Sequence, residues 1–344
     1  TSESFMTGSM LRSKVLPWEQ SMHTACACSR KGRRLLPAVG QLQWGHASLR
    51  MAEGSAGEVR VAERDVIVII PGFLMDCNDF EPMARHFRED GWPAAVVPMR
   101  WWEWIPCLGG RSARPVLERI DYTVRKALEW DRSEEFVLPP YSYTPVDLIS
   151  DFLTNPGGML KVGGSSSPDE FPPVEPRGKD FVGDTPALPS ASKVILVAHS
   201  AAGWISRIFL SHRPYGGRAY RGSRLVRTLI TLGTPHGDSD GVAFENVKWA
   251  NRESAPQGVR CVAVGGTGTL GSSNDFTRNA YTFCGFPADK VVELDGDGVT
   301  PLQSSLSFEG SEKLVLEETT HAPSYPAAIA PELHRELKEG KRWY

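Results

Sequence analysis

The sequence of 344 residues lacks long apolar runs and an excess of charge of either sign. A run such as residues 66–70 has the length of a strand, and none approaches the roughly 18 residues that a transmembrane helix needs, so no membrane span is predicted. Lys and Arg number 38 against 41 Asp and Glu, which gives a formal net charge of −3 at pH 7. Because nucleic-acid binders usually carry a basic patch, this balance predicts no nucleic-acid partner.

Cysteine is also scarce, with six residues in the whole chain. None forms a C-x-x-C pair, and no histidine stands at ligand spacing to them, so the sequence predicts no zinc site and no disulfide scaffold. We expect mostly buried or free thiols in a reducing compartment. The positions are Cys26, Cys28, Cys77, Cys107, Cys261 and Cys284.

The first fifty residues differ in charge from the rest of the chain. Their acidic residues are Glu3 and Glu19, and their basic residues are Arg12, Lys14, Arg30, Lys31, Arg33, Arg34 and Arg50. A basic, acid-poor leader without an apolar core of about 7–15 residues is typical of an organelle transit peptide rather than of a secretory signal. We therefore expect residues 1–57 to be a disordered leader or a transit-peptide-like segment. A plastid (chloroplast) is the suspected location, and the cytoplasm is the alternative.

From residue 58 to 344, short apolar runs alternate with amphipathic segments. Strands are expected at residues 65–70, 93–98, 193–198, 225–232, 260–264 and 313–316, and helices at 80–87, 116–128 and 201–213. Parallel strands need crossover connections, so this alternation predicts an α/β fold: a mostly parallel central sheet with helices on both faces. Residues 155–192 are rich in Gly, Pro and Ser, and we expect a disordered insertion there or, alternatively, a lid.

Ser200 carries the sharpest chemical signal, because it stands between a predicted strand and a predicted helix. The sequence around it, Ala-His-Ser-Ala-Ala-Gly at residues 198–203, places small residues on both sides of the serine. A nucleophile elbow requires this pattern, since its tight turn lifts the hydroxyl above the sheet and leaves no room for large neighbours. Ala198 and Ala202 stand where glycine is usual, and alanine is the next smallest residue. We predict that Ser200 is a nucleophile.

A nucleophilic serine needs a base, and the base needs an orienting carboxylate. After an elbow of this kind the usual chain order is serine, acid, histidine. The glycine-rich turn at residues 294–301 carries Asp295 and Asp297, and His321 follows the last predicted strand. Both segments leave carboxyl ends of strands, where α/β sheets build their sites. We predict Asp297 as the acid, with Asp295 as the alternative, and His321 as the general base.

Two backbone N–H groups are expected to form an oxyanion hole beside the nucleophile. One should come from Ala201, the residue after the serine. The other should come from the loop after residues 65–70, where Gly72 permits close backbone approach. There the N–H of Phe73 is the expected donor, with Leu74 as the alternative.

These motifs together resemble the α/β-hydrolase superfamily on its lipase and esterase side. The chain is similar to plastid-type serine hydrolases of plants and algae and to the deacylases that act on glycosylphosphatidylinositol lipids. The segments that carry the resemblance are residues 68–73 (Val-Ile-Ile-Pro-Gly-Phe), 198–203, 231–237 (Thr-Leu-Gly-Thr-Pro-His-Gly), 279–285 and 296–301, together with His321. The segment at 231–237 contains His236, which precedes the acid and so breaks the family order; we interpret it as a structural wall residue. Pro71 stands where many relatives have a histidine that orders the oxyanion loop.

The resemblance and the triad imply a serine hydrolase that cleaves carboxylic (acyl) esters through an acyl-enzyme, without a metal or other cofactor. The aromatic residues 100–106 (Arg-Trp-Trp-Glu-Trp-Ile-Pro) are expected on the rim of the site, which would favour a lipid-like substrate and peripheral contact with a membrane surface. The alternative is that these tryptophans pack in the core. Three other functions stay open: a non-catalytic ligand receptor of the same fold, an acyltransferase that uses the same triad, and a scaffold protein.

Overall fold

The computed structural model describes residues 65–110, 112–130, 138, 193–216, 218–240, 244–325, 327–328 and 330–344. The expected leader at residues 1–57 and the expected insertion at residues 155–192 lie outside the described residues. Within them, Cys77, Cys107, Cys261 and Cys284 are free thiols, as expected.

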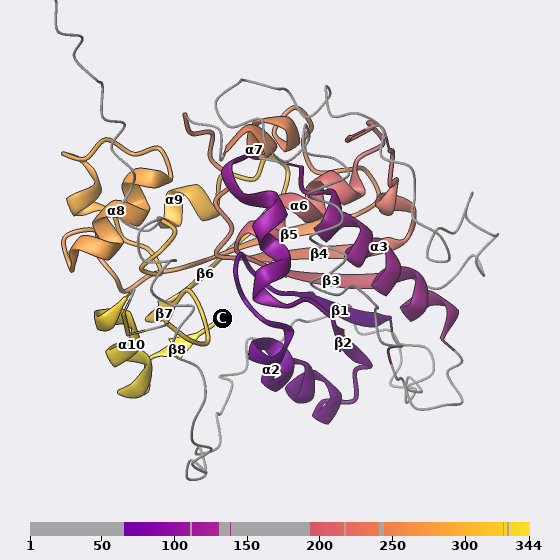
Figure 1. The fold of residues 1–344 in the computed structure, drawn as a ribbon, viewed down its shortest axis with the longest axis horizontal. Coiled ribbons are helices and arrows are strands. Elements are labelled where there is room, and N and C mark those ends of the chain that lie inside the picture. Colours follow the sequence, from indigo (N-terminus) through magenta and orange to yellow (C-terminus); the bar gives the residue numbers. More distant parts are fainter. Residues whose placement is uncertain are drawn as a thin grey trace, which may run out of the picture.

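A six-stranded parallel sheet forms the centre of the molecule, so the predicted α/β fold is confirmed (Figure 1). Its strands lie in the order β2-β1-β3-β4-β5-β6. They are β1 (Val66–Ile70), β2 (Ala94–Val96), β3 (Val194–His199), β4 (Val226–Leu232), β5 (Arg260–Gly266) and β6 (Glu312–Leu316). A second, two-stranded parallel sheet joins β7 (Thr319–Thr320) to β8 (Arg342–Trp343). Each of the six predicted strands is present, with ends shifted by one or two residues.

The helices lie between these strands in the chain. They are α2 (Cys77–Glu89), η2 (Trp101–Gly110), α3 (Arg114–Glu129), α6 (Ala201–Leu210), η5 (Gly222–Arg224), α7 (Glu245–Ala250), α8 (Asp275–Phe283), η7 (Val291–Glu293), α9 (Leu302–Ser305) and α10 (Pro331–Lys338). The prediction of a helix over 201–213 was too long at its C-terminal end. Ser211 already has extended backbone angles, and Pro214 disfavours the helical conformation of the residue before it.

Alternate residues of β1 enter two different cores, which explains why the strand is apolar throughout. Val66, Val68 and Ile70 pack on the face covered by α3 and α6. Ile67 and Ile69 pack on the opposite face, against residues of α2 and of the segment around β8. Successive side chains of a strand point to opposite faces, so a strand buried on both faces needs apolar residues at every position. The prediction of elements on both faces of the sheet is confirmed.

The strand order places a topological switch point between β1 and β3. From β1 the chain goes to β2 on one side of the sheet, and the rest of the sheet, from β3 to β6, is built on the other. Ligands of open α/β sheets bind at the carboxyl ends of the strands at such a point. The loop that begins at Pro71 follows β1, and Ser200 follows β3. Because β1 and β3 are parallel neighbours, the fold alone brings this loop and Ser200 together.

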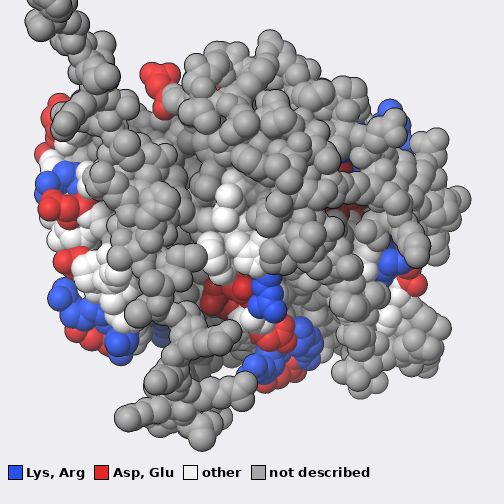
Figure 2. Space-filling model, in the orientation of Figure 1, with Lys and Arg blue, Asp and Glu red and all other residues white. Residues whose placement is uncertain are grey.

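Charges of both signs are mixed on the described part of the face drawn in Figure 2, where red and blue side chains lie next to one another. Ion pairs of the described surface include Arg88 with Glu81 at 2.7 Å and Arg100 with Asp76 at 3.1 Å. The second pair ties the segment before η2 to the N-terminal cap of α2.

Candidate active site

Ser200 occupies a sharp turn between β3 and α6, with φ +53° and ψ −129°. Its N–H donates to Leu232 O at 2.8 Å, and its carbonyl accepts from Thr234 Oγ1 at 2.7 Å. A positive φ is uncommon for a residue other than glycine, and such strain persists where the surroundings enforce it, often at functional sites. The backbone at Ser200 therefore has the strand–turn–helix geometry that a nucleophile elbow needs.

Gly72 brings the loop after β1 into contact with this turn. A Cβ placed on Gly72 would lie 2.3 Å from His199 Nδ1 and 3.0 Å from Ser200 Cβ, so no larger residue fits there without movement. Phe73 and Leu74, the expected and alternative oxyanion donors, follow directly on the same loop, and Leu74 has a positive φ of 58°. Ala201 is the first residue of α6, where backbone N–H groups have no partner within the helix. The loop that carries Phe73 and Leu74 therefore begins beside Ser200, and Ala201 directly follows Ser200.

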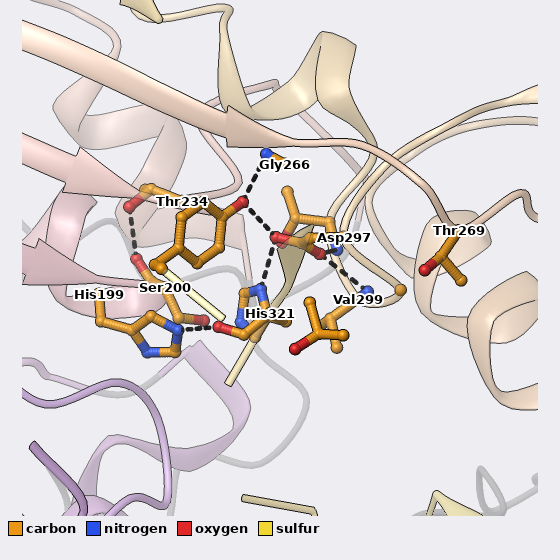
Figure 3. A network of polar contacts seen from close by, with 12 residues as sticks. His199, Ser200, Thr234, Gly266, Thr269, Asp297, Val299 and His321 are labelled. Atoms are coloured by element: carbon orange, nitrogen blue, oxygen red, sulfur yellow. Dashed lines mark hydrogen bonds and ion pairs between the residues drawn. The ribbon is translucent and has the colours of Figure 1, made fainter. Parts of the chain in front are cut away.

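Asp297 is fully buried, and four donors surround its carboxylate (Figure 3). Oδ1 accepts from the backbone N–H groups of Val299 at 3.0 Å and Thr300 at 2.7 Å. Oδ2 accepts from His321 Nδ1 at 2.8 Å and from the hydroxyl of Tyr344 at 2.7 Å. Burial acts to raise the pKa of Asp297, but the charge of His321 and these hydrogen bonds outweigh it, so the pKa lies below its usual value. The carboxylate is ionised at neutral pH.

Asp295, the alternative acid, has a different role. Its Oδ1 accepts from the backbone N–H groups of Gly268 at 2.8 Å, Thr269 at 3.1 Å and Gly296 at 2.8 Å. These bonds tie the loop after β5 to the turn that carries Asp297. The geometry therefore favours Asp297, the residue that pairs with His321.

His321 follows β7 and is almost completely buried. Its backbone N–H donates to Asp297 O at 3.0 Å, and its carbonyl accepts from His199 Nε2 at 2.5 Å. Because Nδ1 donates to Asp297, the neutral ring leaves Nε2 free to accept a proton. Its ring lies 4.7 Å from that of His199, the neighbour of Ser200, and Figure 3 shows Ser200, His199 and His321 grouped beside Asp297. Among the described residues no hydrogen bond joins Ser200 Oγ to His321; in unliganded enzymes this contact is often long and tightens with substrate.

His236 has no part in this group. The guanidinium of Arg207 lies 3.3 Å from its Nδ1 and can only donate, so Nε2 carries the proton and donates to Thr231 Oγ1 at 3.0 Å. Its ring also packs against Phe308, with 5.0 Å between the ring centroids. With both nitrogens engaged, this buried histidine fits the wall role expected for it and not that of a base.

The aromatic run at residues 100–106 divides between the surface and the core. Trp104 is fully buried and meets the ring of Phe73 edge-on, with 5.6 Å between the centroids. Trp101 and Ile105 are 48% and 37% exposed. Glu103 forms a buried ion pair with Arg119 that fixes η2 on α3. The alternative that these tryptophans pack in the core thus holds for Trp104, whereas the rim position expected for the run stays a prediction for the exposed Trp101.

Tyr344 and His199 are the two site residues that the sequence motifs did not identify. His199 stands inside the elbow motif, and burial, reinforced by the neighbouring charge of His321, lowers its pKa to about 3. Tyr344 belongs to no motif, and the pairing of β7 with β8 is what brings it to Asp297. Strands of two residues leave no recognisable pattern in the sequence, so the sequence alone could not have identified Tyr344 as a neighbour of Asp297.

In the part of the chain that the structure describes, no group of three or more His, Cys, Asp or Glu side chains could hold a metal ion. No described helix is long and apolar enough to cross a membrane.

No protein-family model matches this chain, and a search of the curated proteins finds no match. The parallel sheet is consistent with an α/β-hydrolase-like fold.

Proposed function

We propose that this protein is a serine hydrolase of the α/β-hydrolase superfamily that cleaves carboxylic esters. The single observation that carries the proposal is the buried 2.8 Å hydrogen bond between His321 Nδ1 and Asp297 Oδ2, next to the strained turn at Ser200. An ionised acid, a histidine with Nε2 left free and a serine on an elbow form the set that activates a hydroxyl for acyl transfer.

In the proposed reaction Ser200 Oγ attacks the ester carbonyl while His321 Nε2 takes its proton. Asp297 stabilises the imidazolium that forms, and the N–H groups of Ala201 and of Phe73 (or Leu74) bind the oxyanion. Collapse of the tetrahedral intermediate breaks the bond to the alcohol, which leaves with the proton from His321. Water then attacks the acyl-enzyme by the same steps and releases the acid. No metal or organic cofactor takes part.

A lipid-like acyl ester is the substrate class we propose. Trp101 and Ile105 expose apolar surface on the helix that packs against Phe73, next to the proposed oxyanion loop. Tryptophan favours the boundary between apolar and aqueous phases, so this surface suits peripheral contact with a membrane or lipid aggregate. The basic, acid-poor leader supports a plastid as the proposed location.

A fluorophosphonate probe tests the proposal, because it reacts covalently with an activated serine. Wild type should be labelled, and Ser200→Ala and His321→Ala should not. His212→Ala is the matched control, since its ring is hydrogen-bonded to Ser223 Oγ, outside the group around Asp297, and its labelling should match wild type. The same proteins, run on p-nitrophenyl esters from C2 to C16, separate an esterase from a lipase. A folded wild type that is not labelled would refute the hydrolase and leave the ligand receptor as the better reading.

A further inference from the structure

The hydroxyl of Tyr344 lies between the backbone of β5 and the carboxylate of Asp297. The N–H of Gly266 donates to the hydroxyl oxygen at 2.7 Å, and the hydroxyl donates to Asp297 Oδ2 at 2.7 Å (Figure 3). An ionised carboxylate can only accept, and the Gly266 N–H occupies one side of the phenol oxygen, so the phenol proton has one direction open to it. It points at the oxygen that also accepts from His321 Nδ1.

The register of the small sheet explains how Tyr344 reaches this position. Thr320 on β7 is paired with Trp343 on β8, so the next residues of the two strands, His321 and Tyr344, lie side by side. Their rings meet edge to face, with 6.4 Å between the centroids. Trp343 packs edge-on against Phe80 of α2 at 5.6 Å, which fixes β8 on the main body of the molecule. The phenol is therefore held from several sides, and its hydroxyl is not free to turn away.

With Tyr344 in place, each oxygen of the Asp297 carboxylate receives two hydrogen bonds. Backbone donors hold Oδ1, whereas both donors to Oδ2 are side chains. Removal of the phenol oxygen would leave Oδ2 with His321 as its remaining donor among the described residues, and the Gly266 N–H without its acceptor.

We propose that Tyr344 is a positioning residue of this active site: its hydroxyl fixes the Asp297 carboxylate so that Oδ2 faces His321 Nδ1. It acts on the reaction only through that carboxylate. The inference rests on the proposed function, and goes beyond it by assigning a role to a residue outside the triad and the oxyanion hole.

Tyr344→Phe tests the role, because it removes one oxygen and keeps the packed ring. Tyr215→Phe is a matched control. The hydroxyl of Tyr215 is also buried, accepts from a backbone N–H (Ala113, 2.8 Å) and donates to a side-chain oxygen (Asn246 Oδ1, 2.6 Å), but in the core beside α3 and α7. Both variants lose one bond from a backbone N–H and one to a side-chain oxygen, and both should lose thermal stability.

On a p-nitrophenyl ester that wild type cleaves, Tyr344→Phe should lower kcat about tenfold and leave KM within twofold, because a misplaced acid slows the chemical step without touching substrate. Tyr215→Phe should leave both constants within twofold of wild type. The low-field proton resonance of His321 Nδ1–H, assigned by its loss in His321→Ala, should move in Tyr344→Phe and stay in place in Tyr215→Phe. Equal behaviour of the two phenylalanine variants in kcat and in the resonance would overturn the positioning role.

The two readouts separate this inference from the proposed function. If wild type hydrolyses no ester and takes up no fluorophosphonate, the proposed function fails. The resonance of His321 Nδ1–H then still tests whether Tyr344 positions Asp297. A resonance that moves in Tyr344→Phe alone would support the hold of Tyr344 on the Asp297–His321 pair. A resonance unchanged in both variants would refute it.

Discussion

Two buried histidines, His321 and His236, lie in different surroundings and illustrate what makes a histidine useful as a base. His321 faces the carboxylate of Asp297, and no hydrogen bond within the described residues engages its Nε2. His236 faces the guanidinium of Arg207 and has both nitrogens engaged. Burial and then the charge of Arg207 lower the pKa of His236 well below its usual value, so it stays neutral. Burial alone does not equip a histidine to act as a base; the role proposed for His321 depends on the anion beside its Nδ1 and on the open Nε2.

Loss of the anion should give the largest effect. Asp297→Asn should lower kcat by about 10³- to 10⁴-fold with little change in KM, because an amide does not hold the histidine in the required tautomer or stabilise its charged form. Asp295→Asn, which keeps an acceptor for the three N–H groups at that turn, should cost less than tenfold. Steady-state kinetics on one ester compare the two. Equal losses would show that the acid has been assigned to the wrong aspartate.

Disruption of the other histidine should cost stability rather than activity. His236→Ala leaves the hydroxyl of Thr231 and part of the guanidinium of Arg207 without a partner, so the free energy of unfolding should fall by about 1–3 kcal/mol. Urea unfolding measures it, and kcat at a temperature where the variant is folded should stay within threefold. A fall in kcat comparable with that of Asp297→Asn would place His236 in the reaction and abolish the contrast.

The pH dependence of stability should reflect the histidines held neutral by burial. The pKa of His199 is lowered to about 3, and that of His236 is lowered well below 6.5, so between these values and about 6.5 the unfolded chain binds more protons than the folded one. Stability therefore falls as the pH falls below about 6.5, by up to about 1.4 kcal/mol per pH unit for each histidine. Urea unfolding at pH 7.0, 6.0 and 5.0 measures the slope, and His236→Ala should reduce it. An equal slope in that variant would contradict a neutral His236.

The smallest expected effect concerns the rim. Trp101→Ser should lower kcat/KM for C12 to C16 esters by about three- to tenfold and change it less than twofold for C2 to C4 esters, because only long chains reach the exposed ring. Leu314→Ser is the control, since Leu314 on the edge strand β6 has the same 48% exposure. If both variants lose activity alike on long esters, general surface hydrophobicity accounts for the effect, and the rim has no special role.

The sequence was informative where one local pattern determines the outcome. Five apolar residues in a row specify a strand buried on both faces, and small residues around Ser200 specify a tight turn. The C-terminal end of β5 was harder to predict from the sequence, because Gly265 and Gly266 suggest a turn although they continue the strand. A Cβ on Gly266 would lie 3.0 Å from the Tyr344 hydroxyl and 3.1 Å from Asp297 Cβ, so glycine is needed there for close packing. Such a requirement arises only in three dimensions.

The choice between the two aspartates also needed the structure. Asp295 and Asp297 stand two residues apart in one glycine-rich turn, and no sequence pattern tells which carboxylate faces a histidine 24 residues further along the chain.

The N-terminal cap of α2 was not predicted, for a different reason. Asp76 and Asp79 bond reciprocally to each other's backbone N–H groups, a local arrangement that starts the helix at Cys77, before the apolar spacing that indicated it.

The four hydrogen bonds of Asp297 have a consequence for the order in which the molecule becomes competent. Their donors come from the turn at residues 299–300, from His321 and from Tyr344, whereas Ser200 arrives with β3 much earlier in the chain. These donors lie within 47 residues of Asp297, whereas β3 pairs with β1 across the much longer interval from residue 70 to residue 194, and closure of the longer loop costs more entropy. Under the proposed function, activity would therefore report the pairing of β1 with β3, because a chain that has formed the group around Asp297 but not that pair would hold its acid without a positioned serine.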